Sequence, residues 1–280
     1  MNQLIGVEML KIRKRMMTWI LLAILVAFMV LYMVFSYISV TSSSTRLSQE
    51  VHSALRIALQ FPLAFTLVLS VTQSIGIILL IILTASLVGN EYGWGTVSQV
   101  IGRNGRRTFY INAKVVALII ITLLLVLIGL AIGTLLSIFT TYKLAGGVNW
   151  DFFTLSFAGH LIKMFGWTAF TILIYELLAM FFATWGRSAI AGIGGALGYY
   201  FIQAILIGVF NDASGWSHRI PDYLIGHNAQ ALLVTGLDRG PFSSSTNIPS
   251  GLHATVVLVI YGMVFLGMLL YLFRKQDLTT

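Results

Sequence analysis

The chain has 280 residues, of which 58% are hydrophobic and 9% are charged, and it has a formal net charge of +8 and no cysteine. Soluble domains carry about 25% charged residues, so this composition excludes an ordinary water-soluble protein and predicts one embedded in a membrane. The lack of cysteine excludes disulfides, zinc–cysteine sites and iron–sulfur clusters within the chain.

Residues 2–15 place apolar side chains at near-helical spacing among charged ones. Leu4, Val7 and Leu10 mark apolar positions, and acidic and basic residues alternate with them. This pattern predicts an amphipathic helix that lies on the cytoplasmic interface before the chain enters the membrane. A frayed basic tail is the alternative interpretation.

Six long apolar blocks fill most of the remaining chain. No charged residue occurs between Arg15 and Arg46 or between Lys114 and Lys143, and Glu176 alone interrupts the fourth block. A bilayer core requires roughly 20 apolar residues per crossing helix, and each block meets that length. We therefore expect an all-α integral membrane protein with transmembrane spans at about residues 17–40, 62–89, 115–140, 161–184, 189–210 and 254–273.

The connections between the spans are short, and residues 1–280 are expected to form a single transmembrane domain. The second half of the loop after span 1 is predicted to form a short surface helix. Residues 89–114 form the longest predicted inner loop, and residues 211–253 form the longest outer one. The middle of that outer loop is apolar enough to form a further short helix before span 6.

The distribution of basic residues predicts the topology. Cytoplasmic loops are enriched in Lys and Arg. One set of alternate connections, together with the segments before span 1 and after span 6, holds 11 of the 17 basic residues: Lys11, Arg13, Lys14, Arg15, Arg103, Arg106, Arg107, Lys114, Arg187, Arg274 and Lys275. We therefore expect both termini in the cytoplasm, and the positive charge is attributed to topology and not to nucleic-acid binding.

The inner loop GNEYGWGTVSQVIGRNGRRTFYINAK, residues 89–114, is the most informative hydrophilic stretch. Glu91 closes an apolar block, glycines follow, and a short apolar run precedes a cluster of arginines. This order predicts a short amphipathic helix parallel to the membrane that docks on a cytoplasmic partner. The alternative is a solvated loop whose arginines only maintain topology.

Two sequence features in this chain resemble a known family. The motif Glu-Tyr-x-x-Gly-Thr at residues 91–96 is followed by a basic cluster that ends at Lys114, and residues 7–15 read VEMLKIRKR. Both features, with six spans and an interfacial N-terminal helix, resemble the permease subunits of ABC-2 type exporters. The branch with the greatest similarity includes the bacitracin-resistance and lantibiotic-immunity permeases.

The resemblance implies a function and a set of partners. It implies that cytoplasmic ABC ATPase subunits bind ATP and Mg²⁺, that a second six-span permease completes a homo- or heterodimer, and that an amphipathic, lipid-like or peptide substrate moves outward. It also implies a location in the cell membrane, in bacteria. The residues expected to couple the ATPase to the spans are Glu91, Tyr92, Gly95, Thr96, Arg103, Arg106 and Arg107.

The chain itself is not expected to be an enzyme or to bind a cofactor. A phosphate-binding loop of the form GxxxxGK[ST] requires a Gly-Lys pair, and this sequence contains none. The histidines do not show the convergent spacing of a metal site, so none is expected. ATP hydrolysis is therefore assigned to a separate subunit.

Glu176 is the one acidic residue within a predicted span. A carboxylate at the centre of a membrane helix costs about 2.5–3.5 kcal/mol, so a partner is expected. Candidate partners are Arg187, Gln203, Tyr199 and Tyr200. In one interpretation Glu176 and Gln203 line the substrate path or gate, and in the other Glu176 tethers two helices. The alternative function for the chain, an ATP-independent secondary transporter or a membrane scaffold, depends on Glu176.

Two glycine pairs predict close contacts between helices. Gly129 and Gly133 in span 3, and Gly194 and Gly198 in span 5, have the GxxxG spacing that allows helix backbones to approach.

Overall fold

The structure is a computed structural model that describes residues 2–42, 49–95, 107–210, 216–234 and 249–275. This part of the chain is all helical and has no strand. Its helices, in chain order, are α1 (Asn2–Lys14), α2 (Met16–Thr41), α3 (Gln49–Ala58), α4 (Ala64–Gly93), α6 (Arg107–Ala145), α7 (Leu155–Trp185), α8 (Ala189–Phe210), the 3₁₀ helices η1 (Trp216–Arg219) and η2 (Pro221–Tyr223), α9 (Ile225–Val234) and α10 (Gly251–Lys275).

Six helices within the described residues are long and apolar enough to cross a membrane: α2, α4, α6, α7, α8 and α10. They correspond to the six predicted spans, and they indicate a multi-pass membrane protein. The short helices α3 and α9 lie in the two loops where the sequence predicts them. The helix α1 coincides with the predicted N-terminal helix.

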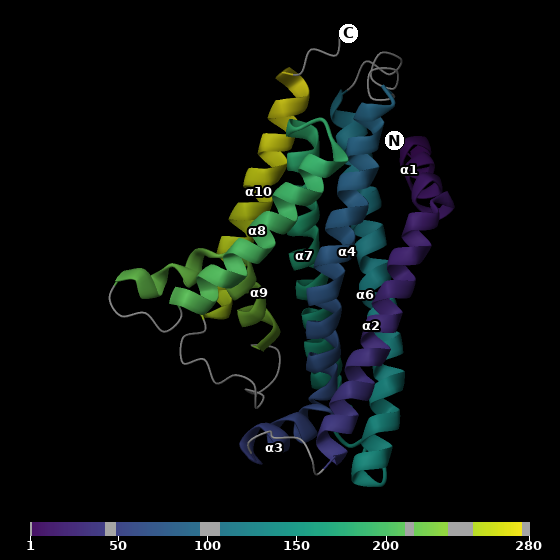
Figure 1. The fold of residues 1–280 in the computed structure, drawn as a ribbon, viewed down its shortest axis with the longest axis vertical. Helices are drawn as coiled ribbons and strands as arrows, with labels where there is room; N and C mark the ends of the chain where they lie inside the picture. Colours follow the sequence, from purple (N-terminus) through teal and green to yellow (C-terminus); the bar gives the residue numbers. More distant parts are fainter. Residues whose placement is uncertain (1, 43–48, 96–106, 211–215, 235–248, 276–280) are drawn as a thin grey trace.

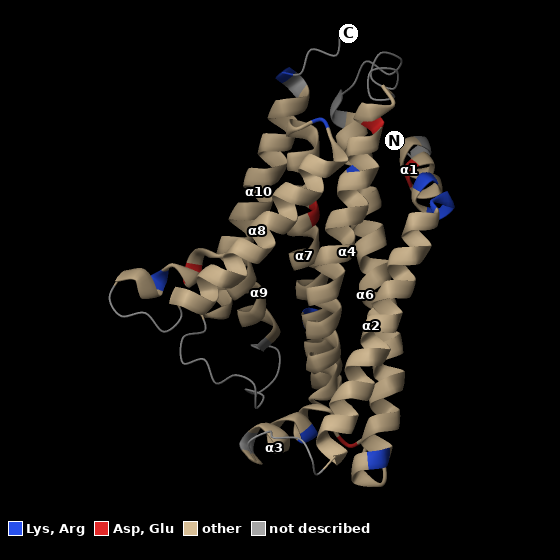
Figure 2. Cartoon of the chain, in the orientation of Figure 1, with Lys and Arg blue, Asp and Glu red and all other residues tan. Residues whose placement is uncertain are grey.

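The bundle is built around α4 and α7. In each of these helices 61% of the residues in the most apolar 18-residue stretch are buried, compared with 11% in α8. Figure 1 shows α2 and α6 on one side of this central pair, and α8, α9 and α10 on the other. The helix α1 and the last turn of α10 lie at the same end of the bundle (Figure 1). Figure 2 shows that charged residues gather toward the two ends of the long helices.

The helices on either side of the predicted inner loop 89–114 extend into it. The helix α4 continues to Gly93 and α6 already begins at Arg107, so both ends of the expected loop are helical. Charged residues had been treated as the ends of the apolar blocks. Here Glu91 and Lys114 stay within helices because they are buried and paired with each other, as described below. The amphipathic helix predicted between residues 96 and 106 lies outside the described residues.

Close packing on α4 depends on glycines in α6. A methyl group added to Gly129 would come within 2.6 Å of Thr72, and one added to Gly133 within 2.3 Å of Val68. By contrast, a methyl group on Gly194 or Gly198 in α8 would meet nothing within 4 Å in this chain. The first GxxxG pair therefore packs within the chain, and the second has open space beside it.

Candidate functional site: a buried charge cluster at one end of the bundle

Four charged side chains from three helices meet beside the end of α4. They are Glu8 and Lys11 from α1, Glu91 from the last turn of α4 and Lys114 from α6. These residues are called the charge cluster below. Because α1 packs against α6 beside the end of α4, Lys11 and Glu8 reach residues 80 and 106 positions later in the chain.

The geometry of the charge cluster is a closed ring of ion pairs. Lys11 Nζ lies 2.7 Å from Glu8 Oε1 and 2.8 Å from Glu91 Oε1. Lys114 Nζ lies 3.0 Å from Glu8 Oε2 and 2.8 Å from Glu91 Oε2. Each carboxylate therefore accepts from both lysines, and two positive and two negative charges cancel.

Most of this ring is removed from solvent. The exposed fractions of Glu8, Glu91 and Lys114 are 6%, 4% and 3%. The side chain of Lys11 closes the outer edge and is 35% exposed. Partial burial by itself lowers the pKa of Lys11, but the hydrogen bonds and charges of the two glutamates outweigh it, so its pKa is raised above 10.5.

Tyr110 completes the inner side of the cluster. Its hydroxyl donates a hydrogen bond to Glu91 Oε2, and Lys114 Nζ lies 5.0 Å from the centroid of its ring. A buried carboxylate is destabilising unless its lone pairs are satisfied, and Glu91 is satisfied by two lysines and one phenol. The cluster thus holds the end of α4 against both α1 and α6.

The next residue, Tyr92, connects the same end of α4 to the last span. Its ring centroid lies 6.3 Å from that of Phe273 in α10, and the Phe273 ring also lies 6.0 Å from that of Tyr110 in a tilted arrangement. Phe273 is only 1% exposed, so this contact belongs to the core. A displacement at the end of α4 would consequently reach α1, α6 and α10.

The end of α4 has a defined geometry. Gly95 has a φ of 66°, a left-handed conformation that glycine adopts without strain, and its N–H donates to the carbonyl of Tyr92 at 3.1 Å. The guanidinium of Arg15, from the link between α1 and α2, lies 5.6 Å from the centroid of the Trp94 ring.

Of the seven predicted coupling residues, the structure describes some and not others. Glu91, Tyr92 and Gly95 lie together at the end of α4. Thr96, Arg103 and Arg106 lie outside the described residues, and of Arg107 only the backbone position, at the start of α6, is described. The sequence analysis did not identify Glu8, Lys11 and Tyr110 as site residues, because their partners Glu91 and Lys114 lie on other helices.

The predicted partners of Glu176 are wrong. Glu176 is fully buried, and its two oxygens accept hydrogen bonds from Thr122 Oγ1 at 2.6 Å and Thr84 Oγ1 at 3.3 Å. These threonines belong to α6 and α4, so Glu176 links α7 to both of them. No salt bridge to Glu176 is found in the part of the chain that the structure describes.

Gln203 lies in a different place. It contacts the hydroxyl of Tyr175, and its Oε1 accepts from the backbone N–H of Gly226 at 3.1 Å. It lines a cavity of about 240 Å³ between α4, α7, α8 and α9, called the polar cavity below. Gln73 also lines it, and its buried Oε1 has no hydrogen-bond partner among the described residues. Glu176 does not line this cavity, so the structure does not bring the two predicted path residues together.

Comparison with known protein families gives a match over most of the chain. A family model described as protein of unknown function (DUF2705) matches residues 58–279. No curated protein matches the chain. Glu91 and Lys114 lie within the matched range, and Glu8 and Lys11 precede it.

Proposed function

The chain belongs to the family described as protein of unknown function (DUF2705), and we propose that it is the membrane-embedded permease subunit of an ATP-driven exporter. In this proposal a separate cytoplasmic ABC subunit binds and hydrolyses ATP, and a second six-span permease completes the transporter. The substrate is an amphipathic, lipid-like or peptide molecule that moves outward.

One observation carries the proposal: the charge cluster lies where the inner segment expected to contact the ATPase leaves the bundle. Glu91 lies in the last turn of α4, which ends at Gly93. Its carboxylate forms ion pairs of 2.8 Å with Lys11 of α1 and with Lys114 of α6. A buried and fully paired cluster resists deformation, because separating any pair exposes an uncompensated charge. Force applied to this segment would therefore move the helix ends together.

Two further features support parts of the proposal. The polar cavity offers amide and hydroxyl groups, and no charged residue, between helices of the spanning bundle. The outward face of α8 presents Gly194 and Gly198 with open space beside them, which suits the close approach of a helix from a second permease.

The alternative function, an ATP-independent transporter or scaffold, depends on Glu176. The two hydroxyl partners of Glu176 and its separation from the polar cavity favour a tether between α4, α6 and α7. The permease proposal therefore assigns no proton-transfer role to Glu176.

Co-purification tests the proposal. The tagged chain, extracted from native membranes in mild detergent, is expected to bring down a protein with a GxxxxGK[ST] motif and to show ATP hydrolysis. Glu91→Ala and Arg106→Ala should reduce recovery of that protein, whereas Lys143→Ala, on the opposite end of α6, should not. Recovery of no ATPase from membranes that contain the intact chain would refute the proposal.

A further inference from the structure

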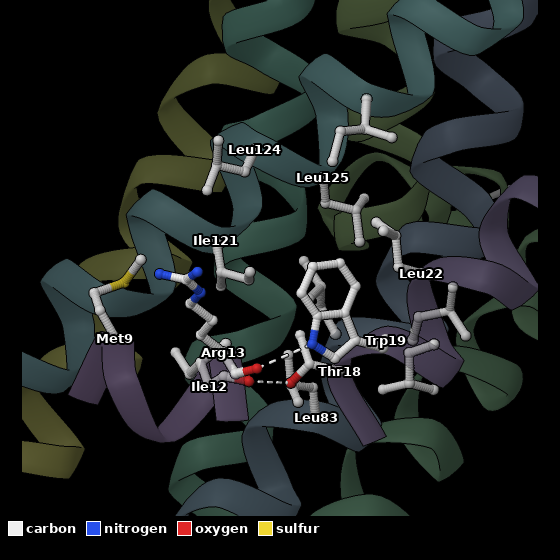
Figure 3. Close-up of a pocket in the computed structure, with 14 residues that line it drawn as sticks. Met9, Ile12, Arg13, Thr18, Trp19, Leu22, Leu83, Ile121, Leu124 and Leu125 are labelled. Carbon is white, nitrogen blue, oxygen red and sulfur yellow. Dashed lines mark hydrogen bonds between the residues drawn. The ribbon is translucent and has the colours of Figure 1, made fainter. Parts of the chain in front are cut away.

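An apolar groove, separate from the charge cluster and the polar cavity, lies between α1, α2, α4 and α6. It has a volume of about 240 Å³. Figure 3 shows Leu83 of α4 and Ile121 and Leu124 of α6 along its walls, with Trp19 and Leu22 from α2 opposite them. Its surface is almost wholly apolar, although it is not sealed inside the protein.

The groove opens on the face of the bundle that meets the membrane. Trp19 is 58% exposed and Leu124 is 43% exposed, and both belong to helices long enough to span a bilayer. An apolar space of this kind does not hold water well, and cavities of about 150 Å³ already bind small hydrocarbons. In a membrane, the apolar molecule that reaches it first is a lipid chain.

The groove runs along a spanning helix. Its walls extend along α6 from Ile121 to Ile128, which is about 10 Å at 1.5 Å per residue. An almost wholly apolar lining of this length matches part of an acyl chain. We therefore take an acyl chain as the occupant, and the test below separates it from a helix of a second copy.

A positive charge lies at the edge of the groove. Arg13, in the last turn of α1, is exposed and lines the groove, and Figure 3 shows its guanidinium beside Ile121 and Met9. Among the described residues no ion pair engages Arg13, and the two carboxylates of the charge cluster are bound by lysines. Lys14 adds a second exposed charge at the same turn.

The edge of the groove is also held in place. Trp19 Nε1 donates to the carbonyl of Arg13 at 3.0 Å, and Thr18 Oγ1 donates to the carbonyl of Ile12 at 2.7 Å. These bonds fix the turn between α1 and α2. The position of Arg13 relative to the apolar walls is therefore set by the structure before any ligand arrives.

We propose that this groove binds one acyl chain of an anionic phospholipid, whose phosphate contacts the guanidinium of Arg13. Arg presents paired donors that match phosphate oxygens, and a basic turn beside a membrane helix attracts anionic headgroups. Tryptophan favours the headgroup level, which is where Trp19 would then lie. The inference requires only a chain that lies in a membrane, so it holds or fails independently of the exporter proposal.

Lipid titration of the purified full chain tests the site. Binding of dioleoylphosphatidylglycerol and of dioleoylphosphatidylcholine is counted on the intact protein by native mass spectrometry. Arg13→Gln should weaken phosphatidylglycerol binding about fivefold, since a basic residue near the surface contributes about that factor, and should leave phosphatidylcholine unchanged. Lys143→Gln, an exposed lysine at the other end of α6, is the matched control.

A second variant tests the apolar part. Leu124→Trp, which fills the groove from its edge, should weaken both lipids, whereas Leu135→Trp should weaken neither, because Leu135 is 68% exposed on the same helix and does not line the groove. Wild-type binding in Arg13→Gln or in Leu124→Trp overturns the proposal. Conversion of a dimer to a monomer by Leu124→Trp would identify a second copy as the occupant and would overturn it too.

Fluorescence quenching locates the lipid independently of the Arg13 and Leu124 variants. Phosphatidylglycerol with brominated acyl chains quenches nearby indoles, so the quenched share of the fluorescence should fall in Trp19→Phe relative to the wild type. Trp167→Phe, on α7, serves as the control for loss of a tryptophan elsewhere in the bundle. Equal quenching in the wild type and in Trp19→Phe would show that no lipid chain lies in the groove.

Discussion

Replacing Lys114 by methionine tests the charge cluster directly. The substitution preserves the length of the side chain but removes its charge, which lies 3.0 Å from Glu8 and 2.8 Å from Glu91. Lys114 is 3% exposed, so water cannot replace it. Breaking a buried ion pair from one side costs about 3–5 kcal/mol, and because Lys11 still contacts both carboxylates we expect about 3 kcal/mol.

Thermal unfolding in detergent, followed by tryptophan fluorescence, measures this loss. Domains of 150–250 residues lose about 2–4 °C per kcal/mol, which predicts a fall of about 6–12 °C for Lys114→Met. Lys11→Met removes a lysine from the same two carboxylates at a position where the side chain is 35% exposed. The loss of unfolding free energy in Lys11→Met should be smaller, within about 1 kcal/mol, because solvent screens this ion pair.

A double variant separates the loss of pairing from the loss of packing. Glu8→Gln combined with Lys114→Met leaves Lys11 and Glu91 as one balanced pair, at 2.8 Å. We expect it to recover at least about 1 kcal/mol relative to the sum of the single variants, as directly interacting residues do. The reasoning is refuted if the two single lysine variants unfold at the same temperature, or if the double variant is strictly additive.

Three further outcomes are expected. Gly89→Ala should destabilise the fold by about 1–3 kcal/mol, because its methyl group would lie 2.1 Å from the backbone nitrogen of Ala189, whereas Gly93→Ala meets nothing within 4 Å and should be neutral in the same unfolding assay. Glu176→Gln should change the free energy of unfolding by no more than about 1 kcal/mol and should leave transport unchanged. A selective loss of transport would instead place this residue in the substrate path. The stabilisation that Lys11 contributes is the difference in unfolding free energy between the wild type and Lys11→Met. It should be fully present below the ordinary lysine pKa of 10.5 and should be lost only as pH rises through the higher pKa of the folded state. Loss of this stabilisation between pH 7 and 9 would contradict a raised pKa.

The sequence predicted the number and order of the long helices because the length of an apolar run is set by the thickness of a bilayer. It also placed the helices at Gln49–Ala58 and Ile225–Val234. It did not anticipate that α4 and α6 continue into the predicted inner loop 89–114, because Glu91 was treated as the end of an apolar block and Lys114 as the end of the basic cluster that follows it. A charged residue ends a buried segment only when it lacks a partner, and these two have each other.

The partners of the charged residues were not predictable for a related reason. Glu8 follows an apolar position of α1, yet it is 6% exposed, while Val7 beside it is 49% exposed. The burial of Glu8 depends on Lys114, 106 positions later, and no local pattern carries that information. The one local signal was the spacing of Glu8 and Lys11 by three residues on a helix otherwise dominated by apolar and basic side chains. Likewise, the hydroxyl partners of Glu176 come from two other helices.

The neutrality of the charge cluster has an electrical consequence. A transmembrane voltage exerts force on net charge, about 2.3 kcal/mol per elementary charge per 100 mV when the charge crosses the full field. Two lysines and two glutamates that move as one body carry no net charge through that field. The charge cluster would therefore add no voltage-dependent work to a motion that carries it, and any voltage dependence of a motion of α1 would come from Arg13 and Lys14.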